Sequence, residues 1–161
     1  MVKHNSKDIP KLLASISVCL LAGAVGSIFT VSSIPNWYAN LTKPFFAPPN
    51  WVFGPVWTSL YVLMGISLFL VWRKGLNKKT RSAVNIFAIQ LALNALWSLA
   101  FFGLKFPIAG FIVIIALWAA IAAAIMKFMK IERNAGLLLI PYIAWVSIAA
   151  ALNLSIVLLN L

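Results

Sequence analysis

Five long runs without a charged residue divide the chain, and this feature constrains its fold more than any other. Each run has at least the roughly 20 residues that a helix needs to cross a bilayer; they cover residues 12–42, 44–72, 82–104, 106–126 and 134–161. We therefore predict an all-α integral membrane protein, with one membrane domain over residues 1–161. The expected bundle of five transmembrane helices covers residues of about 11–32, 51–72, 82–104, 107–127 and 137–159.

The charged residues predict how this bundle is oriented. The chain has 13 Lys and Arg residues against two acidic residues. Eleven of the basic residues lie in the N-terminal tail and in the connections at 73–81 and 127–136, whereas only Lys43 and Lys105 lie on the opposite side. The positive-inside rule then predicts a multi-pass protein of the cell membrane, with a cytoplasmic N-terminus and an outside C-terminus. The charge indicates orientation and contact with lipid headgroups, and we expect no nucleic-acid partner.

The connection at 33–50 is the only long one, and it is rich in proline and aromatic residues. We expect Pro35, Pro44, Pro48 and Pro49 to prevent it from continuing as helix. Prolines also restrict the unbound loop, so ordering it over a ligand costs less entropy than ordering a Gly-Ser loop. The segment is therefore predicted to be a preformed outer lid, and its candidate ligand contacts are Pro44, Phe45 and Trp51.

Several classes of mechanism lack the side chains that they need. Asp8 and Glu132, the only acidic residues, lie in the basic segments, which argues against transport coupled to protons or sodium. The only histidine is His4 and the only cysteine is Cys19, and no pair of such residues has metal-ligand spacing. No serine has a base nearby on its own helix. We therefore expect no metal site and no cofactor.

Aromatic and uncharged polar residues remain, and they recur at helical spacing in three predicted helices, mostly in the outer half and with Trp145 nearer the middle. These groups are Trp57 with Tyr61, Asn94 with Trp97 and Ser98, and Trp145 with Ala149 and Asn153. Two interpretations stay open, because such residues can pack helices together or can line a pocket. A pocket would suit a large, flat, apolar ligand with polar edges. Small residues on other faces favour either packing within the chain or a homodimer.

Three segments carry a resemblance to a known family. They read "WYANLTKPFFAPPNWVFGPVWTSLYVLMG" at 37–65, "QLALNALWSLAFFG" at 90–103 and "PYIAWVSIAAALN" at 141–153. The chain resembles the TspO/MBR family of translocator proteins, or peripheral-type benzodiazepine receptors. The resemblance covers four of the five predicted helices and the long loop.

The resemblance implies a five-helix bundle, often dimeric, that binds porphyrins and other tetrapyrroles, and synthetic benzodiazepine-site ligands, beneath the first loop. Some members are described as promoting light-dependent oxidative breakdown of protoporphyrin, with pocket tryptophans that match Trp57 and Trp145. Passive transport of such ligands, or sensing without turnover, are the alternatives. The family's cholesterol motif is missing from "LNLSIVLLNL" at 152–161, which puts sterol binding in doubt. Carried over by position, the pocket residues are Tyr38, Trp57, Tyr61, Asn94, Trp97, Trp145 and Ala149.

Overall fold

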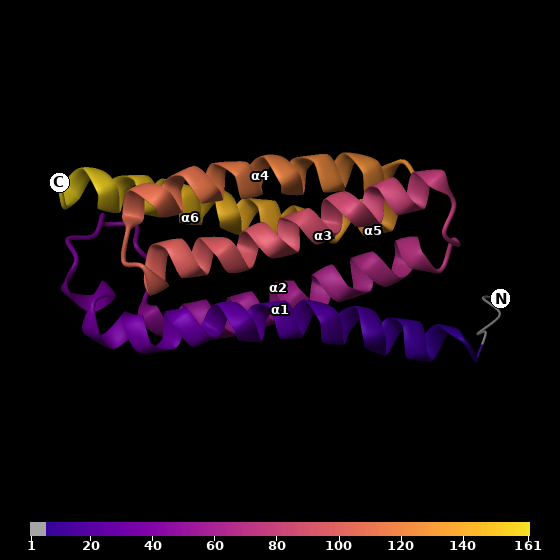
Figure 1. The fold of residues 1–161 in the computed structure, drawn as a ribbon, viewed down its shortest axis with the longest axis horizontal. Helices are drawn as coiled ribbons and strands as arrows, with labels where there is room; N and C mark the ends of the chain where they lie inside the picture. The colour runs from indigo at the N-terminus through magenta and orange to yellow at the C-terminus, as the bar shows by residue number, and fades with distance from the viewer. Residues whose placement is uncertain (1–5) are drawn as a thin grey trace.

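The structure is a computed structural model that describes residues 6–161, and its regular elements are helices running along one common direction (Figure 1). Lys3 and His4, which entered the sequence arguments, lie outside the described residues. Within the described residues, five stretches are long and apolar enough to cross a membrane, which confirms the predicted all-α fold with five spans. The elements are α1 (Asp8–Asn36), η1 (Tyr38–Asn40), α2 (Asn50–Trp72), α3 (Lys78–Ser98), η2 (Leu99–Gly103), α4 (Pro107–Met129), α5 (Arg133–Leu137) and α6 (Ile140–Leu159).

Two prolines change the expected helix boundaries. The prediction that Pro35 ends the first helix is wrong, because α1 continues through it to Asn36. A proline in the last turn removes only one intrahelical bond, and the N–H of Trp37 still reaches the Ser33 carbonyl at 2.9 Å. The fifth span is interrupted between α5 and α6. Pro141 lies in the first turn of α6. Because proline has no backbone N–H, it cannot donate the hydrogen bond that would join α5 and α6 into one continuous helix.

The third span also departs from a regular α-helix near its end. Leu99–Gly103 forms a π-helical turn, in which the N–H of Leu104 bonds to the Leu99 carbonyl at 2.7 Å. The turn carries Phe101 and Phe102, both buried. A π-helical turn adds a residue to the helix and shifts the side chains that follow it. Phe101 and Phe102 thereby both pack against Trp97 in the bundle.

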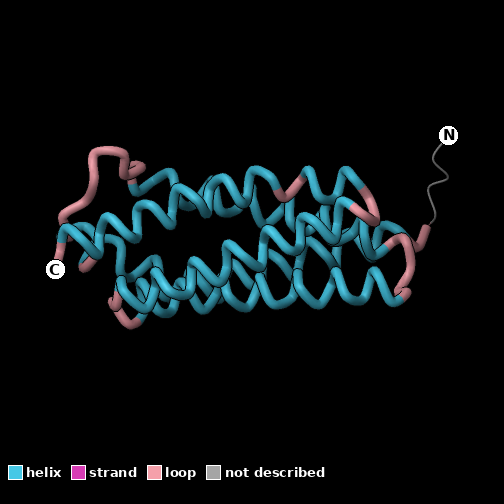
Figure 2. Tube along the Cα trace, turned by 90° about the horizontal axis from the view of Figure 1, so that it is seen from above, coloured by secondary structure: helices cyan, strands magenta, loops and turns pink. Residues whose placement is uncertain are grey.

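The connections lie at two opposite ends of the bundle, as Figures 1 and 2 show. We call one the basic end; it holds the α2–α3 and α4–α5 connections and the start of α1. The loop end holds the long segment at 37–49, the α3–α4 connection and the C-terminus. Near the basic end α1 and α2 are in close contact, since a Cβ atom on Gly65 would lie 2.5 Å from the Ile16 Cα. Phe87 and Phe128 stack there with ring centroids 5.5 Å apart.

Candidate functional site

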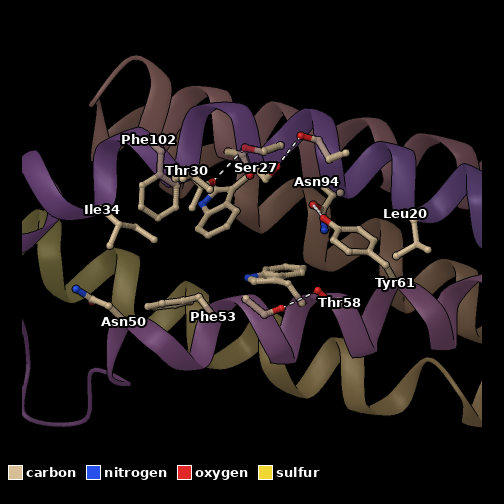
Figure 3. Close-up of a pocket in the computed structure, with 18 residues that line it drawn as sticks. Leu20, Ser27, Thr30, Ile34, Asn50, Phe53, Thr58, Tyr61, Asn94 and Phe102 are labelled. Atoms are coloured by element: carbon tan, nitrogen blue, oxygen red, sulfur yellow. Dashed lines mark hydrogen bonds between the residues drawn. The ribbon is translucent and has the colours of Figure 1, made fainter.

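A cavity of about 350 Å³ lies in the loop-end half, between α1, α2 and α3 (Figure 3). Part of its lining is exposed to the surroundings of the bundle, at Ala24, Ser27 and Val31 on α1 and at Gly54 and Thr58 on α2. The cavity is therefore open sideways between α1 and α2. The remaining lining residues are Leu20, Gly23, Gly26, Thr30, Ile34, Asn50, Phe53, Trp57, Tyr61, Asn94, Trp97, Ser98 and Phe102.

Aromatic rings line the inner side of this cavity. Trp57 stacks on Tyr61, with centroids 5.7 Å apart and planes at 28°. On its other side Trp57 approaches Trp97 at 6.2 Å, and Trp97 stacks on Phe101 at 5.8 Å. The spacing of four residues between Trp57 and Tyr61 places both rings on one face of α2. A flat apolar molecule in the cavity would meet ring surface from both α2 and α3.

A buried chain of hydrogen bonds connects the cavity to the interior of the bundle. The Tyr61 hydroxyl donates to Asn94 Oδ1 at 2.6 Å, and the Asn94 amide donates to the Tyr142 hydroxyl at 2.8 Å. Tyr142 in turn donates to Gln90 Oε1 at 2.7 Å. Figure 3 shows Tyr61 and Asn94 pointing toward one another at the edge of the cavity. The chain satisfies polar groups that would be costly if left alone at this depth and holds both cavity residues in place.

A second, much smaller void of about 20 Å³ lies behind the aromatic rings. Tyr38, Trp145 and Ala149 line this void and do not reach the larger cavity. The two spaces are separated by four side chains that line both, namely Phe53, Trp57, Trp97 and Phe102. The structure therefore brings Trp57, Tyr61, Asn94 and Trp97 together in one cavity. It places the other three predicted pocket residues on the far side of a partition.

Two buried polar atoms in the small void lack a hydrogen-bond partner. They are the Tyr38 hydroxyl and the Trp145 Nε1. Burial raises the pKa of Tyr38 to about 12, so its hydroxyl remains a neutral donor at physiological pH. Unpaired buried donors are uncommon in native proteins, and a ligand oxygen that reached this void would satisfy them. By contrast, the Trp97 ring N–H donates to Asn153 Oδ1 at 3.1 Å.

The long segment at 37–49 is held in place by polar contacts. The Lys43 ammonium lies 3.0 Å from the Tyr38 carbonyl and 3.1 Å from that of Leu41, and it also lies 4.8 Å from the centroid of the Tyr38 ring. Asn160 near the C-terminus exchanges two hydrogen bonds with the Thr42 backbone, at 2.9 and 3.0 Å. These contacts tie Lys43 to Tyr38 within the segment and tie the segment to the end of α6.

The three loop residues predicted to contact a ligand lie elsewhere in this structure. Phe45 is fully exposed and Trp51 is 75% exposed, while Pro44 is half-buried. None of the three lines either space. Phe45 contacts the neighbouring ring of Phe46, at 5.6 Å between centroids. Within the segment at 37–49 only Tyr38 lines the small void, and Asn50, which follows the segment, lines the larger cavity.

Sequence reasoning missed the contribution of α1, which supplies eight of the 18 residues that line the larger cavity. These residues recur at steps of three and four, as in Gly23, Gly26, Ser27, Thr30 and Ile34. Such a face of small and hydroxyl residues was a usable signal. It is also typical of helix packing, and part of it does pack, since a Cβ atom on Gly23 would lie 2.5 Å from the Tyr61 ring.

Conventional catalytic groups are absent from the described lining. Within residues 6–161, no group of three or more His, Cys, Asp or Glu residues could hold a metal ion. The lining of both spaces consists of aromatic, aliphatic, hydroxyl and amide side chains. The arrangement is suited to binding an apolar ligand.

Comparison with known proteins identifies a family. The model described as TspO/MBR family matches residues 15–159. The chain is 48% identical to the tryptophan-rich protein TspO of Archaeoglobus fulgidus, over 95% of this chain and 99% of that protein. It is 42% identical to the protein of the same name from Chlorobaculum tepidum, over 96% and 99%. It is also 37% identical to the human translocator protein, over 80% of this chain and 78% of the human one.

Proposed function

The chain belongs to the TspO/MBR family of multi-pass membrane proteins, and from that premise we propose that it binds a tetrapyrrole such as protoporphyrin in the larger cavity and promotes its light-dependent oxidative breakdown. The observation that carries this proposal is the stack of Trp57 on Tyr61, continued by Trp97, along an open cavity. Ligand pockets usually measure about 300–1000 Å³. At about 350 Å³ with one open side, the cavity accepts a flat macrocycle by its edge, with the opposite rim left in lipid.

The proposed chemistry uses light and dioxygen. A porphyrin absorbs visible light and generates reactive oxygen species beside its own ring, so the protein needs no acid, base or metal for the oxidation. The protein holds the macrocycle in one orientation and places oxidisable indoles beside it. Trp57 already faces the cavity, whereas Trp145 lies behind the partition. We infer that a bound macrocycle displaces Phe53, which lines both spaces and lies 6.1 Å from the Trp145 ring.

Replacing both indoles tests the oxidative part of this proposal. The double variant Trp57→Phe, Trp145→Phe keeps most of the ring surface but removes the easily oxidised groups. We expect protoporphyrin still to quench the remaining tryptophan fluorescence, while its light-dependent loss slows at least about tenfold, or about 1.4 kcal/mol in barrier. Trp118→Phe is the matched control, because Trp118 is 42% exposed and bonds to Ser147, away from both spaces. Equal loss of porphyrin in the double variant and the parent would rule out a catalytic role for the indoles.

Passive transfer of the ligand is the second candidate, favoured by the sideways opening between α1 and α2. A carrier of this kind would speed the escape of protoporphyrin from sealed vesicles in the dark. The double variant should then release porphyrin as fast as the parent, because stacking area is retained. Escape no faster than from protein-free vesicles would exclude passive transfer.

Three further features belong to the same proposal. Synthetic benzodiazepine-site ligands would occupy the same cavity and compete with protoporphyrin. A homodimer would form through small residues that face outward on another helix, such as Ala116 and Ala119 on α4. The basic end would face the cytoplasm, since it carries nearly all of the positive charge. Labelling of a cysteine introduced at Lys105 in intact cells tests that orientation.

A further inference from the structure

A groove at the basic end carries a cluster of cations that the proposed function does not use. It has a volume of about 400 Å³ and lies along the start of α3, where its lining includes Lys78, Arg81, Ser82 and Asn85. Lys127 reaches the same place from α4, since its ammonium lies 2.9 Å from the Ser82 hydroxyl. Three positive side chains from two helices therefore meet at one hollow in the surface.

These cations have no acidic partner in the described part of the chain. The one salt bridge found within residues 6–161 joins Lys74 to Glu132, at 2.8 Å. The first turn of α3 contains no acidic residue, although the N-terminal end of a helix favours negative charge. The Asn77 side chain already accepts the backbone N–H groups of Lys79 and Thr80. An anion in the groove would therefore be held by side chains, and it would reduce the repulsion among the three neighbouring cations.

The groove also continues onto a surface that faces lipid. Asn85 is exposed and lies seven residues after Lys78, or about 10 Å further along the helix. Ile89, one turn beyond Asn85, is 51% exposed, and Leu96 on the same face is 45% exposed. An exposed amide is costly against hydrocarbon but not against a headgroup. The order of cations, amide and apolar residues along one face matches the order of phosphate, ester and acyl chain in a phospholipid.

From these observations we propose that the groove is a binding site for an anionic phospholipid of the leaflet at the basic end. Arg81 binds the phosphate through two of its N–H groups, and Lys78 adds a second positive charge. Lys127, Ser82 and Asn85 bond to the glycerol and ester oxygens, and the acyl chain follows Ile89. Basic pockets between membrane helices bind headgroups in this way. The site is distant from the aromatic cavity, so it can be tested separately from porphyrin binding.

Native mass spectrometry of the full chain in detergent tests the proposal, because it counts lipids retained by the monomer and by any dimer. The probes are dioleoyl phosphatidylglycerol and dioleoyl phosphatidylcholine. We expect selective retention of phosphatidylglycerol, with affinity falling roughly 10- to 30-fold in the double variant Lys78→Gln, Arg81→Gln. Lys7→Gln, Lys130→Gln is the matched control, because it removes the same charge from two exposed residues outside the groove and should change affinity by less than about threefold.

Three results would overturn the site. One is an equal loss in both double variants, which would indicate diffuse attraction. Another is equal retention of the two lipids by the parent. A third is displacement of phosphatidylglycerol by millimolar inorganic phosphate, which would indicate a site for soluble anions. If the groove variant fails to fold, Asn85→Ala serves in its place, because it keeps every charge. It should weaken the retention of phosphatidylglycerol about fivefold. Unchanged retention in Asn85→Ala would also contradict the proposal. The quenching of tryptophan fluorescence by protoporphyrin should be the same in all of these variants as in the parent, whether or not the parent binds protoporphyrin.

Discussion

The two ends of the α1–α2 pair are packed in opposite ways. Toward the basic end the helices touch at Gly65, where the backbone of Ile16 occupies the place of a side chain. Toward the loop end the same helices separate around the cavity, and Gly54 on α2 has nothing within 4 Å of its Cβ position. Gly65 therefore allows α1 and α2 to touch in one half, whereas the space beside Gly54 is open in the other half. The same helix pair thus combines a closely packed half, which brings α1 and α2 into contact, with an open half that leaves room for a ligand.

Buried hydroxyl groups are satisfied at some sites and not at others, and the Ser15 hydroxyl toward the basic end, like that of Tyr38, has no partner. In the interior, Tyr142 bonds to both Asn94 and Gln90, and at the basic end the Ser67 hydroxyl donates to the Ala135 carbonyl at 2.7 Å. Beneath the loop, the Tyr38 hydroxyl has no partner. A satisfied buried hydroxyl stabilises the fold, whereas an unsatisfied one costs free energy until a ligand bonds to it. Three predictions test these differences in packing and in polar contacts.

The largest effect is expected for Gly65→Val. A branched side chain has no room against the Ile16 backbone, so α1 and α2 must move apart, and unfolding should require about 3 kcal/mol less free energy. Gly54→Ala is the control, and it should leave stability unchanged or raise it slightly, because alanine is the better helix former. Thermal unfolding of purified protein in detergent measures both. Similar melting temperatures for Gly65→Val and the parent would show that the two halves do not differ in this respect.

Intermediate effects on stability are expected when two buried tyrosines are replaced, and the two effects should have opposite signs. Tyr142→Phe leaves the Asn94 amide and the Gln90 carbonyl oxygen without a bond, and should lower stability by about 2 kcal/mol. Tyr38→Phe removes a hydroxyl that has no partner, so it should raise the stability of the ligand-free protein by about 1 kcal/mol. The same unfolding assay compares them. A loss of stability in Tyr38→Phe would mean that its hydroxyl is bonded after all.

The smallest effect concerns the salt bridge at the basic end. The hydrogen bond from Lys74 lowers the pKa of Glu132 below its usual value. A depressed pKa contributes stability above the unfolded pKa, near 4.3, and this contribution is lost as the pH falls through the folded value. Because Lys74 is 43% exposed, solvent screens the pair, and Glu132→Gln should cost less than about 1 kcal/mol at pH 7. Unfolding curves of variant and parent should converge once the pH has fallen below the lowered pKa of Glu132 in the folded protein.

The helical spans could be predicted from the sequence because charge and length decide them. The charged segments at 73–81 and 127–136 cannot enter hydrocarbon, so the spans had to lie between them. The effects of Pro35 and Pro141 could not be predicted by the same reasoning. Proline is tolerated in the last turn of a helix and in its first turn, and only the neighbouring contacts decide which turn it occupies.

The candidate site was predictable only in part. Trp57 with Tyr61 and Asn94 with Trp97 were recognisable from helical spacing, which keeps each pair on one face. How those faces meet depends on side-chain packing between helices. Phe53 and Phe102 divide the space, and no period in the sequence indicates a partition. The outward direction of Phe45 likewise depends on the conformation that Lys43 gives to the loop.

The sideways opening between α1 and α2 has a consequence for how affinity must be expressed. A molecule that enters past Ser27 and Thr58 comes from the hydrocarbon and not from the aqueous phase. Its occupancy then follows its mole fraction among the lipids, so adding empty vesicles at constant total ligand should dilute it and weaken apparent binding. Dissociation constants for this protein are therefore comparable only at a stated ratio of lipid to protein.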